Sequence, residues 1–124
     1  MKQTRRTRQL GEEIRTRLSE IFLRDLDDPD LRLASVTNVE VASDLRYAKV
    51  WISFIGDDEQ AGRGFTRVKD LASKIRHQLA RRANLRNTPQ LEFVLDTTAA
   101  NALKIQTILN DVLDDSEQGE TDDE

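Results

Sequence analysis

Basic side chains recur along the stretch from Phe65 to Leu85, which reads FTRVKDLASKIRHQLARRANL. Arginine supplies 14 of the chain's 19 bases, and its planar guanidinium group binds phosphate oxygens in pairs. Asp70 is the only acid between Arg63 and Arg86. The candidate phosphate-binding residues of this region are Arg67, Lys74, Arg76, Arg81, Arg82 and Arg86, and a second set near the N-terminus is Arg5, Arg6 and Arg8. This chemistry is typical of contacts to a nucleic-acid backbone.

Catalytic chemistry finds little support. His77 is the only histidine, and it shares a helical spacing with Asp70 and Ser73. Catalytic triads draw their members from separate elements around a cleft with an oxyanion hole, which one helix face does not supply. We therefore expect no catalytic residue and a protein that is not an enzyme.

Metal and cofactor sites are not expected either. Four aspartates between Asp25 and Asp30 invite a calcium loop, but its sixth and twelfth positions would hold Asp30 and Val36 in place of glycine and glutamate. The chain has no cysteine, no phosphate-binding loop and no dinucleotide fingerprint.

The net charge of −4 hides an asymmetry. Residues 111–124 hold eight acids and no base, so residues 1–110 carry 19 bases against 15 acids, a net charge of +4. A basic body with an acidic tail indicates an anionic partner. We expect a flexible basic arm over residues 1–8, one domain over 9–113 and a disordered tail over 114–124, which has no apolar residue. No apolar run is long enough for a membrane span or a secretion signal, so we expect a cytoplasmic monomer without membrane contact.

The elements that must position the basic residues follow from apolar spacing. Steps of three and four predict a helix over 8–26, a central helix over 65–85 and a last helix over 99–113. Alternation predicts a hairpin of strands 33–42 and 45–54 and a third strand over 91–95. Residues 57–64 are interpreted as a loop or helix start. The order predicts an α+β fold, with helices covering one face of a three-stranded sheet.

Alternation also assigns side chains to the two faces of this sheet. In the first strand it places Thr37, Val39 and Val41 on one side, opposite Val36. In the second it places Tyr47 and Trp51 on the face away from the helices, where they either stack on bases or pack beneath a neighbouring segment. The residues alone leave both alternatives open.

Several linked segments resemble the ribosome-binding factor A family. They are the first helix ending in Asp28-Pro29, the run from Val39 to Val50, Ile75-Arg76, Leu85-Arg86, and Pro89 to Phe93 with Asp96. The resemblance runs from about residue 8 to residue 113 and rests on the order and spacing of these segments together.

The resemblance implies a KH-type RNA-binding fold of type II order, in which a kink replaces the loop between two helices. The register set by Ile75-Arg76 places this kink at Leu71, Ala72 and Ser73, where the family's glycine is absent, so we expect a milder bend. The resemblance further implies binding to 16S rRNA in free small (30S) ribosomal subunits during late maturation, support of 5′-end processing, and importance for growth in the cold.

Two other functions remain as alternatives: a general DNA-binding protein, and a protein-interaction module whose basic face meets an acidic partner. The acidic tail is itself a candidate for that partner, screening the arginines until RNA displaces it.

Overall fold

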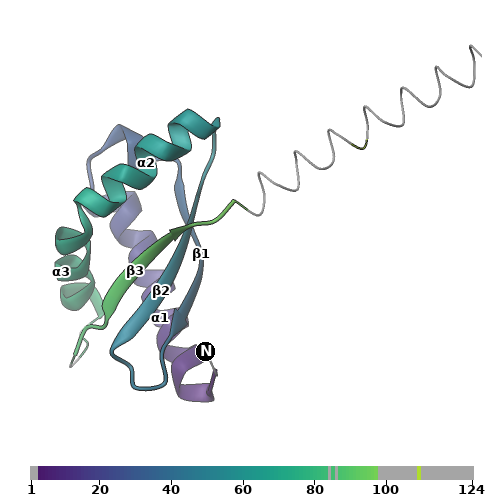
Figure 1. Cartoon of the computed structure of the whole chain (residues 1–124). Coiled ribbons are helices and arrows are strands. Elements are labelled where there is room, and N and C mark those ends of the chain that lie inside the picture. Colours follow the sequence, from purple (N-terminus) through teal and green to yellow (C-terminus); the bar gives the residue numbers. More distant parts are fainter. Residues whose placement is uncertain (1–2, 84, 86, 98–108, 110–124) are drawn as a thin grey trace, which may run out of the picture.

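The computed structural model describes residues 3–83, 85, 87–97 and 109. The chain forms α1 (Arg5–Glu20), β1 (Ala34–Val41), β2 (Tyr47–Phe54), α2 (Asp58–Asp70), α3 (Ala72–Ala83) and β3 (Gln90–Leu95). The helices cover one face of the sheet (Figure 1). This is the predicted α+β architecture, in the element order that the KH-type resemblance implies. The predicted helix over 99–113, apart from Leu109, and the acidic tail lie outside the described residues.

The sheet has the strand order β1-β2-β3. β1 pairs with β2 antiparallel, whereas β3 joins β2 in parallel, with Gln90 opposite Tyr47. Ala48, Val50 and Ile52 of β2 point toward the helices and are at most 1% exposed. The hydrophobic core lies between them and the apolar faces of the helices, whose buried residues include Ile14, Leu18, Val68, Ile75 and Leu79.

The predicted alternation in β1 is wrong at one position. A β-bulge at Thr37 shifts the register between Val36 and Asn38, so that Val36 and Val41 are both buried. A bulge inserts an unpaired residue and moves every later side chain to the other face. The Thr37 hydroxyl donates a hydrogen bond to Asp96 Oδ2 over 2.6 Å, and this contact holds the bulge against the end of β3.

Helix α1 starts at Arg5, earlier than predicted, and therefore includes residues 5–8. Thr4 is the N-cap: its hydroxyl accepts a hydrogen bond from the Thr7 N–H, and the Thr7 hydroxyl accepts one from the Thr4 N–H. Thr7 is only 2% exposed. Such a reciprocal cap satisfies backbone donors at the helix start and fixes where the helix begins. The helix ends in a π-helical turn over Ile21–Asp25.

Helices α2 and α3 are separated at Leu71, within the stretch for which the sequence predicted a bend. Leu71 has φ −97° and ψ 10°, a negative-φ conformation that needs no glycine. Its N–H still contacts the Arg67 carbonyl and its carbonyl accepts from the Ile75 N–H, so hydrogen bonds continue across the break. Figure 1 shows α3 running in a different direction from α2.

Candidate nucleic-acid interface

Two of the predicted phosphate-binding arginines are ion-paired within the fold. Arg82 binds Asp25 through two nitrogens, Nε at 2.6 Å and Nη2 at 2.5 Å, and reaches Glu20 Oε2 at 3.2 Å. These hydrogen bonds hold the pKa of Asp25 below its usual value and raise that of Arg82. Arg82 therefore fastens α3 to the end of α1.

Arg67 has the same role for α2. Its Nε donates to Asp28 Oδ2 over 2.8 Å, and the Asp28 side chain is 14% exposed. The hydrogen bond lowers the pKa of Asp28 and raises that of Arg67. This contact ties α2 to the turn before β1.

Arg76 holds the connection between α3 and β3. Its guanidinium group donates to the carbonyl oxygens of Thr88, over 2.7 Å, and Pro89, over 3.1 Å. Neither acceptor is an anion, and Arg76 has no ion pair with a described residue. Its charge thus remains available to a ligand at the edge of this connection.

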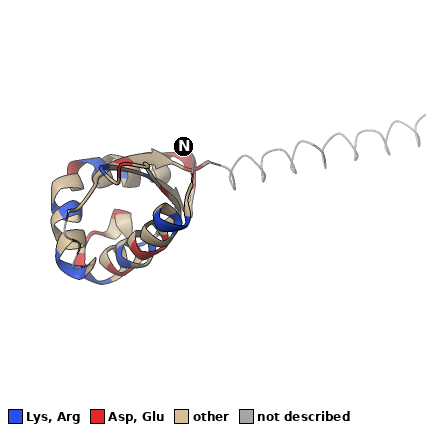
Figure 2. Cartoon of the chain, turned by 90° about the horizontal axis from the view of Figure 1, so that it is seen from below, with Lys and Arg blue, Asp and Glu red and all other residues tan. Residues whose placement is uncertain are grey.

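Lys74 and Arg81 are exposed on α3 and make no hydrogen bond or ion pair with the described part of the chain. Arg86 lies outside the described residues. Of the central basic set, Lys74 and Arg81 are therefore the described side chains that project their charge into solvent. Figure 2 shows that Lys and Arg segments alternate with acidic ones along the helices instead of covering one whole face.

Arg5, Arg6 and Arg8 are exposed on the first turns of α1, whose first turn has no acid. Positive charge at a helix N-terminus opposes the helix dipole, which favours anions there. This placement is locally unfavourable, and a bound phosphate would relieve it. The N-terminal set therefore forms a second cationic surface on a regular helix.

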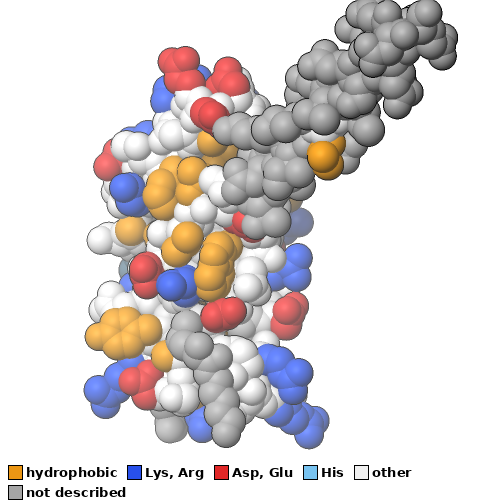
Figure 3. All heavy atoms as spheres, turned by 45° about the vertical axis from the view of Figure 1, so that its right-hand side comes forward, with side chains coloured by type: hydrophobic (Ala, Val, Ile, Leu, Met, Phe, Trp, Pro, Cys, Tyr) orange, Lys and Arg blue, Asp and Glu red, His pale blue; other side chains and the backbone are white. Residues whose placement is uncertain are grey.

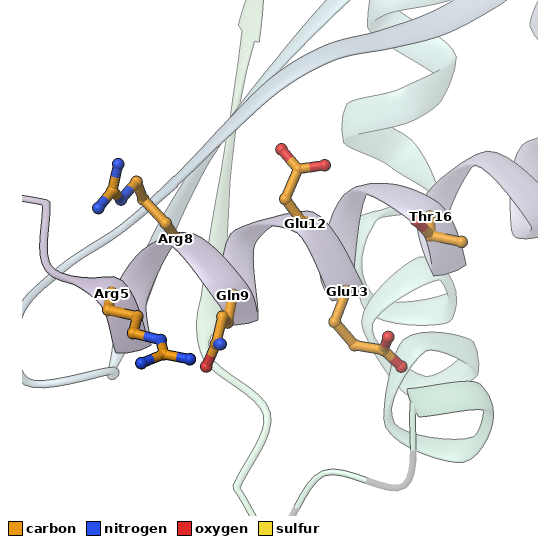
Figure 4. Close-up of a pocket in the computed structure, with 6 residues that line it drawn as sticks. All are labelled: Arg5, Arg8, Gln9, Glu12, Glu13 and Thr16. Atoms are coloured by element: carbon orange, nitrogen blue, oxygen red, sulfur yellow. The ribbon is translucent and has the colours of Figure 1, made fainter.

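Arg5, Arg8, Gln9 and two glutamates line a shallow hollow of about 530 Å³ along α1. Figure 4 shows that Arg8 and Glu12 point to one side of the helix, whereas Arg5, Gln9 and Glu13 point to the other. The side chains diverge and their charges balance, so this hollow does not bring cations together on one ligand.

A larger groove, of about 1040 Å³, lies where α1 begins, where β1 turns into β2 and where β3 starts. It brings Arg6 and Arg76, from the two predicted sets, together with Arg46 and Tyr47. Sequence reasoning did not place Arg46 in the site, because a lone arginine after a turn carries no distinctive spacing. The signal that could have found it is its position directly before the exposed aromatic residue.

The helix-free face of the sheet carries hydrophobic side chains interspersed with charged ones (Figure 3). Tyr47 is 61% exposed, while Trp51 is half-buried with the Lys49 ammonium 5.6 Å from its ring centre. Tyr47 is thus the aromatic side chain of this face that is most open to a ligand.

The residues considered for catalysis are not assembled. Asp70, Ser73 and His77 are all exposed, no hydrogen bond joins them, and Asp70 lies 3.7 Å from Arg67. Among the described residues no group of three or more acids and histidines could hold a metal ion. No helix in the described ranges is long and apolar enough to cross a membrane.

Comparisons with known proteins agree with the resemblance in the sequence. The family model described as ribosome-binding factor A matches residues 6–109. A ribosome-binding factor A from Caldanaerobacter subterraneus subsp. tengcongensis is 37% identical over 108 residues, which cover 86% of this chain and 88% of that protein.

Solved structures of ribosome-binding factor A are also similar to this chain. The crystal structure of ribosome-binding factor A from Thermus thermophilus superimposes with a TM-score of 0.62 at 25% identity, covering 72% of this chain and 94% of that one. A model of the factor from Thermus thermophilus was fitted into a cryo-electron-microscopy map of its complex with the 30S subunit. It superimposes with a TM-score of 0.59 at 27% identity, covering 71% of this chain and 92% of that one. The chain described here belongs to the ribosome-binding factor A family.

Proposed function

We propose that this protein binds the small ribosomal subunit in the cytoplasm as a non-catalytic assembly factor. Family membership over most of the chain and the 30S complex of the Thermus relative support this function. The structural observation that carries it is a set of exposed cations that have no ion-pair partner among the described residues: Lys74, Arg81, Arg5, Arg6 and Arg8. We expect these cations to contact phosphates of immature 16S rRNA.

The mechanism is one of binding and release. Arg67 and Arg82 lock α2 and α3 against α1 and the turn before β1, so the exposed cations keep a fixed spacing. A rigid cationic surface favours the rRNA conformation whose phosphates match it, and the factor leaves when maturation changes that conformation. Support of 5′-end processing and of growth in the cold would follow, because both depend on the rRNA reaching its mature fold.

Reversing two exposed charges tests the surface. Lys74→Glu with Arg81→Glu should weaken binding to immature small subunits, because it removes two cations that we expect to contact phosphates. Each lost phosphate contact should also flatten the plot of log affinity against log salt by roughly 0.7–0.9. Affinity is measured by co-sedimentation with purified precursor subunits at several salt concentrations. Neither side chain has a described hydrogen-bond partner, so circular dichroism should show an intact fold.

The matched control is Arg24→Glu with Arg32→Glu, which changes the net charge equally at two exposed positions between α1 and β1. This control should bind almost as tightly as the unmodified protein. Equal loss in both double variants would show that net charge, and not the α3 surface, governs binding. Competition by duplex DNA as strong as that by small subunits would favour the DNA-binding alternative.

The cellular part of the proposal has its own measurement. In a strain that lacks the protein, precursor 16S rRNA with an unprocessed 5′ end should accumulate, most strongly at low temperature. On a sucrose gradient the protein should migrate with free small subunits and be absent from polysomes. Migration with polysomes would contradict a role confined to maturation.

A further inference from the structure

The groove between the start of α1, the β1–β2 turn and the start of β3 brings basic residues and an aromatic residue together. It lies at the end of the molecule away from α2 (Figure 1). Three separate segments supply cations to its wall: α1 with Arg6, the turn with Arg46, and α3 with Arg76. Asp44 is the only acid among its described lining residues, so the wall has a net positive charge.

The turn that carries Arg46 and Tyr47 is held rigidly. Leu45 has φ 63°, a left-handed conformation that is uncommon for residues other than glycine, and its side chain packs against the core. The Arg46 N–H donates to Asp44 Oδ1 over 3.0 Å, and the Arg46 carbonyl accepts from the Gln90 N–H over 2.8 Å. The backbone strain and these bonds fix where the next two side chains project.

Tyr47, on the face of the sheet away from the helices, supplies a flat surface at the rim of this groove, directly after Arg46. It is 61% exposed, it lines the groove, and its strand partner Gln90 is also exposed and lines the groove. An aromatic ring beside arginines is the combination that binds single strands, because the ring stacks on an unpaired base while the cations contact the neighbouring phosphates. A base inside a duplex does not offer its face in this way.

We propose that this groove binds single-stranded RNA, with one base stacked on Tyr47 and the flanking phosphates against Arg6 and Arg46. Arg76 is already bonded to the carbonyls of the α3–β3 connection and contributes its charge from a fixed position. The groove, of about 1040 Å³, matches the upper end of the size range of small-ligand pockets and has room for a nucleotide. The proposal rests on the proposed function and deepens it by naming an unpaired rRNA segment as the ligand of a site distinct from the exposed face of α3.

Substitution of Tyr47 tests the stacking. The probe is a short RNA of mixed sequence, offered to the full chain as a single strand and annealed to its complement. Tyr47→Ala should weaken single-strand binding roughly 10-fold, as expected for one lost base stack, while Tyr47→Phe keeps the ring and binds like the unmodified protein. Arg46→Ala should lower the salt slope of single-strand binding by about 0.7.

A spectroscopic readout reports on the same contact. Tyr47 is the only tyrosine of the chain, so its ring protons give a single set of NMR signals. Base stacking should shift these signals upfield when the single strand is added, and the duplex should leave them unchanged. The control Arg32→Ala, at an exposed position outside the groove, should bind the single strand like the unmodified protein.

The outcomes separate this proposal from the proposed function. If the unmodified protein co-sediments with small subunits but Tyr47→Ala binds the single strand as tightly as before, the groove proposal is overturned and the assembly role stands. Equal affinity for duplex and single strand, or no binding of either probe, also overturns it. If the single strand binds as described but small subunits do not, the groove is supported and the assembly role fails.

Discussion

The guanidinium group of Arg82 contacts two elements at once, the π-helical turn through Asp25 and α1 through Glu20. The sequence showed that many bases share the central helical stretch, but not which of them the fold neutralises. Asp25 lies 57 residues before Arg82, and only the packing of α1 against α3 brings the two together. The acid-rich run from Asp25 to Asp30 was the available signal, because so many carboxylates in one turn need cations nearby.

Removal of the Arg82 charge should destabilise the fold in a pH-dependent way. The hydrogen bonds from Arg82 lower the folded-state pKa of Asp25 below its unfolded value of about 3.9. The contribution of these hydrogen bonds to the free energy of unfolding is therefore fully present above the unfolded-state pKa. It is lost as the pH falls through the folded-state pKa. Arg82→Gln should reduce the free energy of unfolding in urea at neutral pH, and this reduction should become progressively smaller as the pH falls below about 3.9.

The control for this prediction is Arg32→Gln. Arg32 lies 3.6 Å from Asp27, but both side chains are largely exposed, so the loss should be close to zero across this pH range. A destabilisation by Arg82→Gln that stays constant with pH would contradict a role through the Asp25 carboxylate.

At the scale of elements, apolar spacing predicted the helices and strands, and all of the predicted elements over residues 5–97 are present. The start of α2 was less clear from the sequence, which left residues 57–64 as either a loop or a helix start. The helix begins at Asp58, with Asp57 and Gln60 capping each other, and both glycines of that stretch lie inside it. The bulge at Thr37 could not be predicted, because alternation does not reveal an unpaired residue.

The two glycines of α2 should respond oppositely to alanine. A Cβ at Gly64 would meet the Phe54 ring at 2.3 Å and the Asp30 carbonyl oxygen at 3.0 Å, so Gly64→Ala should lower the free energy of unfolding by about 1–3 kcal/mol. At Gly62 nothing lies within 4 Å, so Gly62→Ala should raise it by about 0.5–1 kcal/mol through helix propensity. Urea unfolding measures both, and equal effects would contradict close packing at Gly64.

At the scale of the whole molecule, the chain has a net charge of −4 although residues 1–110 carry +4, because residues 111–124 hold eight acids and no base. Because these acids are attached to a cationic body, we expect them to compete with RNA phosphates for the same arginines. Composition therefore predicts self-screening of the arginines by these acids.

Deletion of residues 114–124 should tighten RNA binding at low salt and have little effect at high salt, where the screening length falls to a few ångströms. The measurement is affinity for immature small subunits across a salt series. The control replaces the same residues by an uncharged segment of equal length, which should bind like the deletion. Unchanged affinity at low salt would contradict self-screening.

The parallel pairing of β3 with β2 has a consequence for the order in which the chain folds. The β1–β2 hairpin closes through a short turn, whereas Gln90 reaches Tyr47 only across both intervening helices. Long loops close at a greater entropic cost and more slowly, so β3 should join the sheet last, as it also does in order of synthesis. The groove needs Arg6, Tyr47 and Gln90 together. A partly synthesised chain therefore has no such groove, and the RNA binding that we propose for it would begin only when the chain is complete enough to fold.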